Sequence, residues 1–208
     1  QNRLSVGKRP AKLLSLWAIW LCCLLAATNP QWVGEPTSMP SSGRDLLMAV
    51  DISGSMEQTD MSANGRRITR LMAVKKVIGD FVTRRTTDRL GLILFGAQAY
   101  LQAPLTYDRN TVNQLLQEAQ IGFAGRETAI GDAIGLAVKR LRDRPDASRV
   151  LVVLTDGANT AGVLAPDKAT ELAQKAGIKI YTIAFGAESM EVPGIFGSRT
   201  VNPSADLD

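Results

Sequence analysis

Asp51, Ser53 and Ser55 alternate along the chain directly after the uninterrupted apolar run 46–50. In an extended turn alternate residues point the same way, so one carboxylate and two hydroxyls can face a common point. These are hard oxygen donors, which suit Mg²⁺ or Mn²⁺ better than Zn²⁺ or copper. Two interpretations are open from this stretch alone, a cation site or an ordinary turn.

Two further polar residues stand at comparable places. Asp156 follows the apolar stretch 149–154, as Asp51 follows its own. Thr128 lies between the glycine-containing loop 122–127 and an amphipathic helical pattern, where it could also serve as the N-cap of that helix. If the three loops share one edge of a sheet, five oxygen-bearing side chains converge on one point.

The elements that must position these residues follow from hydrophobic periodicity. Apolar runs predict strands, and three- and four-residue spacing predicts helices. The expected strands are 46–50, 89–95, 97–105, 149–154 and 178–185, and the expected helices are 68–85, 107–120, 128–141 and 170–176, with a polar loop at 57–67. This order predicts an α/β fold, a doubly wound and mostly parallel sheet with one antiparallel edge hairpin.

The segment before this domain is apolar and uncharged over residues 13–28. We expect a transmembrane helix there, with a basic cytoplasmic loop at 1–12 and a linker at 29–44. A cleaved signal peptide is the alternative, because it also has a basic start and an apolar centre. Both interpretations place the following domain outside the cytoplasm, in the periplasm of a Gram-negative source.

The formal charge of +4 does not indicate a nucleic-acid-binding protein. Residues 1–12 carry four basic and no acidic side chains, whereas residues 45–208 hold 19 of each sign. The globular part therefore has no basic field for nucleic acid. The sequence contains no His, which removes the commonest general base and zinc ligand. Its two cysteines, Cys22 and Cys23, are adjacent and cannot form a disulfide framework for the domain.

Three segments together resemble a known family. DISGSM at 51–56, ETAIGDAI at 127–134 and LTDG at 154–157 are similar to the three parts of the metal-ion-dependent adhesion site of von Willebrand factor A (VWA) domains. The surrounding sequence resembles the BatA-like bacterial proteins, which are membrane-anchored, named for aerotolerance in Bacteroides and associated with MoxR-type AAA+ ATPases. By this resemblance, residues 45–208 are a VWA domain truncated at its C-terminal end.

The resemblance implies a membrane-anchored protein-interaction module, not an enzyme. Ser53, Ser55 and Thr128 would ligate Mg²⁺ (or Mn²⁺) directly, and Asp51 and Asp156 would act mostly through bound waters. A remaining coordination position would accept an acidic residue from a partner protein, with other Bat-type proteins and a MoxR-type ATPase system as further expected partners. The implied location is the bacterial inner (cell) membrane, with a single span and the domain on the extracytoplasmic side.

Other functions fit the sequence less well. A Mg²⁺-dependent phosphatase of the haloacid dehalogenase type would place DxD after its first strand, but Ser53 replaces the second acid. A nucleotide-binding sheet would need GxGxxG or GxxxxGK[ST] after a strand, and neither occurs. A subunit of an AAA+ ATPase-driven assembly, of MoxR or metal-chelatase type, remains the main alternative.

Overall fold

The computed structural model describes residues 9–28, 43–63, 65–145, 148–186, 190–194 and 197–201. The first eight residues of the predicted basic loop, most of the predicted linker and the C-terminal residues 202–208 lie outside this set. The chain divides into two compact units, residues 1–39 and 40–208. Each unit is described separately below.

The first unit contains one helix, α1 (Arg9–Ala27), which begins four residues before the predicted start. Among the described residues, no helix combines the length and the apolar content needed to cross a membrane. The predicted transmembrane helix at 13–28 is therefore not confirmed. Arg9 and Lys12 occupy the first turn of α1, and the uncharged remainder, 13–27, spans only about 22 Å of a bilayer core of about 30 Å.

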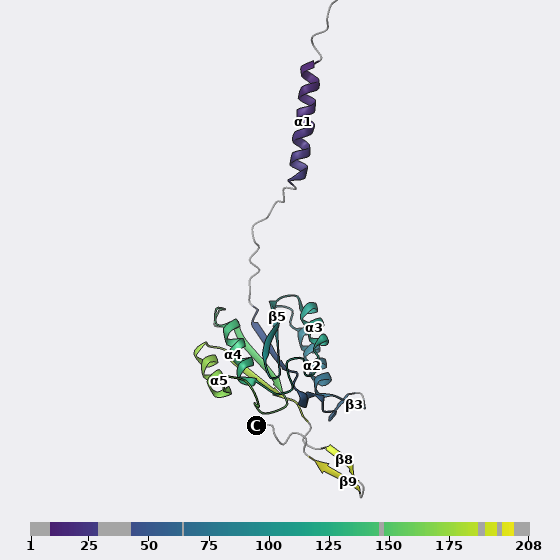
Figure 1. Cartoon of the computed structure of the whole chain (residues 1–208), viewed down its shortest axis with the longest axis vertical. Coiled ribbons are helices and arrows are strands. Elements are labelled where there is room, and N and C mark those ends of the chain that lie inside the picture. The colour runs from purple at the N-terminus through teal and green to yellow at the C-terminus, as the bar shows by residue number, and fades with distance from the viewer. Residues whose placement is uncertain are drawn as a thin grey trace, which may run out of the picture. The chain divides into compact units, whose positions relative to one another are not determined.

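The second unit is a five-stranded sheet with helices on both faces (Figure 1). The sheet order is β5-β4-β1-β6-β7, and only the edge pair β4–β5 is antiparallel. This confirms the predicted α/β fold with one antiparallel edge hairpin. The strands of the sheet are β1 (Asp45–Asp51), β4 (Arg89–Phe95), β5 (Ala99–Thr106), β6 (Arg149–Thr155) and β7 (Lys179–Ala184). The helices are α2 (Arg70–Arg84), α3 (Arg109–Glu118), α4 (Ile130–Leu141) and α5 (Pro166–Lys175).

The central strand β1 is buried along its whole length because it packs on both faces. Leu46, Met48 and Val50 belong to the core under α2 and α3, whereas Leu47 and Ala49 belong to the core under α4 and α5. Alternate residues of a strand point to opposite faces, so one uninterrupted apolar run supplies both cores. Figure 1 shows the two helix pairs on opposite sides of the sheet.

The sequence analysis did not predict two short hairpins. Strands β2 (Met61–Ala63) and β3 (Arg66–Ile68) pair within the expected loop 57–67, and β8 (Met190–Gly194) pairs with β9 (Gly197–Val201). The first hairpin delays the start of α2 to Arg70. Thr69 is the N-cap of α2, where its hydroxyl accepts a hydrogen bond from the backbone N–H of Met72 at 3.2 Å.

The parallel register sends the carboxyl ends of the central strands to one edge. Asp51 at the end of β1 is paired with Phe95 at the end of β4, and Val50 is paired with Leu154 of β6. At the opposite edge, the guanidinium of Arg89 binds both carboxylate oxygens of Asp45, at 2.6 and 2.8 Å. The predicted cation residues therefore lie at the edge where α/β sheets bind ligands.

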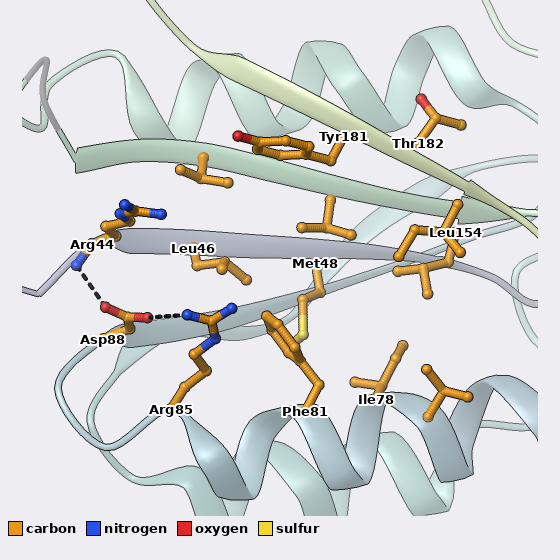
Figure 2. A pocket seen from close by; sticks show the side chains of 14 residues that line it. Arg44, Leu46, Met48, Ile78, Phe81, Arg85, Asp88, Leu154, Tyr181 and Thr182 are labelled. Carbon is orange, nitrogen blue, oxygen red and sulfur yellow. Dashed lines mark hydrogen bonds and ion pairs between the residues drawn. The ribbon is translucent and has the colours of Figure 1, made fainter.

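An apolar pocket of about 430 Å³ lies between α2 and strands β1, β6 and β7 (Figure 2). Leu46, Met48 and Phe81 line it, and the ion pair of Arg85 and Asp88 stands at one end. None of the five predicted cation residues lines this pocket. It is thus a gap in the hydrophobic packing on the α2 face of the sheet, separate from the carboxyl edge.

Gly131 in the first turn of α4 is in close contact with the loop before α5. A Cβ at this position would lie 1.8 Å from the carbonyl oxygen of Leu164. Gly131→Ala should lower the free energy of unfolding by about 1–3 kcal/mol, because overpacking outweighs the helix-propensity gain of up to about 1 kcal/mol. Denaturant unfolding measures this change. Gly79→Ala in α2 is the matched control, since only the Asn113 side-chain oxygen, at 3.2 Å, and the Gln117 amide nitrogen, at 3.8 Å, are near. Equal effects of the two substitutions would contradict the packing argument.

Candidate metal centre

Asp51 is the last residue of β1 and is fully buried. One carboxylate oxygen, Oδ1, accepts a hydrogen bond from the backbone N–H of Ser53 at 2.8 Å. The other oxygen, Oδ2, accepts a hydrogen bond from the hydroxyl of Thr155 on β6 at 2.7 Å. The first bond shapes the turn that follows β1, and the second ties that turn to the neighbouring strand.

Ser53 and Ser55, the next two predicted residues, connect this turn to Asp156 through their hydroxyls. The Oγ atoms of Ser53 and Ser55 are 3.0 Å apart, and the Ser55 hydroxyl donates to Oδ1 of Asp156 at 2.6 Å. Adjacent ligands of an octahedral Mg²⁺ ion, at 2.0–2.1 Å from the metal, lie about 3 Å from each other. The spacing of these oxygens therefore fits such an ion. Ser55 is the partly exposed member of the group, whereas Ser53 and Asp156 are buried.

Thr128 is held between the other two loops through its backbone. Its N–H donates to the Thr160 hydroxyl at 2.9 Å, and its carbonyl accepts from the N–H groups of Thr160 and Ala161. The preceding loop is bound to the Asp51 turn, since Gly54 N–H donates to the carbonyl of Arg126 at 2.9 Å. Backbone hydrogen bonds thus join the loops after β1 and β6 to the loop before α4.

Thr128 does not cap the helix that follows it. The N-cap of α4 is Ala129, which makes no side-chain capping bond, so the simpler interpretation of Thr128 is wrong. The Thr128 side chain is nevertheless nearly buried, at 5% exposure. Because the Thr128 side chain does not cap α4, its hydroxyl could instead bind a ligand.

Arg70 joins the site although the sequence analysis did not single it out. Its Nη1 donates to Oδ2 of Asp156 at 2.9 Å, and its Nε and Nη2 donate to Asp60 at 2.6–3.0 Å. Arg70 is 1% exposed. One sequence signal could have revealed it, because Arg70 precedes Val74 by one helical turn and so falls on the apolar stripe of α2. A charged residue on such a stripe indicates a buried ion pair.

Burial also changes the titration of Asp51. Its pKa is raised from 3.8 to about 6, mainly because burial disfavours the charged form and to a smaller extent because of the negative charge of Asp156. Hydrogen bonds from Ser53 and Thr155 oppose this rise. In the metal-free protein the Asp51 carboxylate is therefore destabilised at neutral pH, and a cation nearby would relieve that cost.

The described residues contain no cluster of three or more His, Cys, Asp or Glu side chains that could hold a metal. The predicted donors at this edge are the hydroxyls of Ser53, Ser55 and Thr128 and the carboxylates of Asp51 and Asp156. Residues 45–198 match the family model of the von Willebrand factor type A domain. The chain belongs to the VWA domain family.

Relatives of this VWA domain share its sequence and fold. An uncharacterized protein of Borreliella burgdorferi is 33% identical over 147 residues, covering 71% of this chain and 42% of that protein. The chain thus spans less than half the length of this relative. Two solved structures superpose with TM-scores of 0.61, an aerotolerance-related membrane protein of Bacteroides fragilis (26% identical, covering 77% of this chain and 82% of that one) and BatB of Bacteroides thetaiotaomicron (27%, covering 77% and 80%). Beyond its VWA fold, the chain is therefore similar to aerotolerance-related membrane proteins and to Bat-type proteins.

A more distant structure has the same fold. Proximal thread matrix protein 1 of the mussel byssus is 24% identical, with a TM-score of 0.58 over 70% of this chain and 36% of that one. In that protein the metal-ion-dependent adhesion site (MIDAS) motif is occupied by zinc. A VWA relative of this chain thus binds a divalent metal at its MIDAS motif.

The VWA domain should gain stability when the charge at Asp51 is removed. The pKa of Asp51 in the folded state lies above its ordinary value. The contribution of Asp51 to the free energy of unfolding is therefore fully present below about pH 4 and is lost as the pH rises through about 6. Asp51→Asn should raise the free energy of unfolding of the metal-free protein at pH 7 by about 1–3 kcal/mol, and by close to nothing at pH 4. Denaturant unfolding at both pH values, in chelator, measures the difference.

Asp108→Asn is the control of opposite sign. Asp108 caps α3, and its hydrogen bonds with Thr111 lower its pKa, so its charge stabilises the folded state. This variant should gain nothing at pH 7. An effect of Asp51→Asn on the free energy of unfolding that is the same at pH 7 as at pH 4 would contradict the account of Asp51.

Proposed function

We propose that this VWA domain binds a divalent cation, Mg²⁺ or Mn²⁺, and uses it to bind an acidic residue of a partner protein. The observation that carries the proposal is the spacing of the site oxygens. Ser53 Oγ and Ser55 Oγ lie 3.0 Å apart, which suits adjacent ligands of a small octahedral ion, and the Ser55 hydroxyl also donates to Asp156 Oδ1 at 2.6 Å. The single most direct reading of this arrangement is a MIDAS.

Within the proposed site, Ser53, Ser55 and Thr128 are the direct ligands, and Asp51 and Asp156 act mostly through water. When bound, the ion supplies a positive centre with a free coordination position that attracts a carboxylate. The protein's own part is to hold the donors in place. Thr155 and the Ser53 N–H fix both oxygens of Asp51, and the Thr160 loop fixes the backbone of Thr128.

The geometry favours a binding module over a phosphatase. In a haloacid dehalogenase-type enzyme, Asp51 would be the nucleophile and would need a free oxygen facing the substrate. Here both oxygens accept hydrogen bonds, and the side chain is fully buried. The alternative of a subunit in an AAA+ ATPase-driven assembly uses the same cation site and differs only in the partner.

We place the protein at a membrane. Support comes from the similar structure of the Bacteroides fragilis aerotolerance-related membrane protein. Helix α1 presents apolar side chains on all sides, with Leu14 at 71% and Trp17 at 65% exposure, and such a surface suits contact with lipid. Placement of the domain on the extracytoplasmic side of the inner membrane, and partnership with other Bat-type proteins or a MoxR-type ATPase, stay predictions.

Mg²⁺ should raise the thermal unfolding midpoint of the chain. At ten times the dissociation constant, a ligand of the native state adds about 1.4 kcal/mol, or roughly 3–6 °C for a domain of this size. Thr128→Val should abolish the rise, because it removes one hydroxyl ligand and keeps the shape. Thr170→Val is the control, since Thr170 is exposed on the outer side of α5 and its hydroxyl donates to the backbone of that helix. A rise that persists in Thr128→Val would overturn the assignment of Thr128.

The acidic-partner part needs a separate test. A library of random peptides displayed on phage is bound to the immobilised protein in Mg²⁺ and eluted with chelator. We expect enrichment of peptides that contain Asp or Glu, and no enrichment on the Thr128→Val protein. Peptides that stay bound in chelator, or that show no acidic preference, would contradict a metal-mediated carboxylate contact.

A further inference from the structure

Arg70, Asp60 and Asp156 form a buried ionic group directly behind the proposed cation site. The side chains of Arg70 and Asp60 are 2% and 1% exposed, and that of Asp156 is 0% exposed. Asp60 accepts hydrogen bonds from the guanidinium at both oxygens from Nε and at Oδ2 from Nη2. These bonds fix the orientation of the planar Arg70 guanidinium, here called the fork, so that its remaining nitrogen, Nη1, points at Asp156.

The consequence for Asp156 is that its two oxygens have different partners. Oδ1 receives the Ser55 hydroxyl at 2.6 Å, on the side of the proposed ligands, and Oδ2 receives Nη1 of Arg70 at 2.9 Å. A guanidinium at hydrogen-bond distance from Oδ2 repels a second cation from that same oxygen. Asp156 therefore offers the ion, or its bound water, one oxygen only.

Asp51 is held by neutral donors instead, since the Ser53 N–H and the Thr155 hydroxyl each donate to one of its oxygens. Asp156 is then the carboxylate that is prevented from chelating an ion with both oxygens. Ca²⁺ takes six to eight oxygen ligands at about 2.3–2.6 Å and often uses bidentate carboxylates, whereas Mg²⁺ takes six at about 2.0–2.1 Å. A site in which Asp156 offers one oxygen only favours the smaller, octahedral ion.

We infer that Arg70, held by Asp60, is a positioning residue that restricts Asp156 to one oxygen and so makes the site selective for Mg²⁺ or Mn²⁺ over Ca²⁺. This inference rests on the proposed cation-binding function. Its basis is the fixed position of the guanidinium beside Asp156 Oδ2 and not the net charge of the group, since the Asp60 carboxylate offsets the charge of Arg70. The other observed Arg–Asp fork, Arg89 with Asp45, lies at the opposite edge of the sheet and supplies a natural control.

The test measures the dissociation constants of the full chain for Mg²⁺ and for Ca²⁺ by isothermal titration calorimetry. The wild type should bind Mg²⁺ more tightly than Ca²⁺. In Arg70→Lys, which keeps the charge but loses the fork, the preference for Mg²⁺ over Ca²⁺ should fall at least fivefold. Asp60→Asn, which loosens the fork from behind, should shift the preference in the same direction. Arg89→Lys should leave the preference unchanged.

The outcomes separate the inference from the function on which it rests. If the wild type binds neither ion, the proposed function fails. If the wild type binds Ca²⁺ at least as tightly as Mg²⁺, the inference fails by itself, even where the Arg70 variants do not fold. A purely structural role for Arg70 would weaken the binding of both ions equally in folded Arg70→Lys and Asp60→Asn, and that result would also overturn the inference.

Discussion

The parallel pairing of β1 with β6 is the constraint on which the candidate metal centre depends. It sets the ends of the two strands side by side, so that the Thr155 hydroxyl reaches Asp51 at 2.7 Å and Asp156 reaches Ser55 at 2.6 Å. Both strands must be buried on two faces for this edge to form, and the alternating cores of β1 provide that burial. The site is therefore a consequence of the sheet, and its loops add the remaining donors.

The arrangement is costly without an ion. A fully buried Asp51 with its pKa raised to about 6 opposes folding at neutral pH. A second carboxylate, Asp156, is also buried and needs the guanidinium of Arg70 for compensation. Functional sites often violate local stability rules in this way, and binding of a ligand to the native state returns the lost stability. The metal-free domain should thus be the less stable form of this protein.

Much of the fold could be predicted from the sequence because its signals are local. The apolar runs of β1, β4 and β6 mark the central strands within a residue of their observed ends. The alternation of Asp51, Ser53 and Ser55 likewise revealed one loop of the site. The hairpin β2–β3 was missed because strands of three residues, one of them with Arg66 and Arg67, carry no periodic signal.

The parts of the site that could not be predicted depend on contacts between distant segments. Arg70 and Asp156 are 86 residues apart, and Thr155 and Asp51 are 104 apart. No local pattern determines such pairs. For Thr128 the local pattern favoured an N-cap, yet tertiary hydrogen bonds of its loop shift the start of α4 to Ile130. Helix α1 begins at Arg9, four residues before the predicted span, because that prediction followed hydropathy and the first turn carries the charged Arg9 and Lys12.

The most direct test of the central claim is a crystal structure of the protein grown in Mn²⁺, with anomalous diffraction recorded at the manganese absorption edge. The account predicts one strong anomalous peak at the carboxyl edge of the sheet, within about 2.3 Å of the hydroxyls of Ser53, Ser55 and Thr128. The absence of a peak there at saturating Mn²⁺, with the Ser55–Asp156 hydrogen bond intact, would contradict it. The five residues would then be turn and loop devices only.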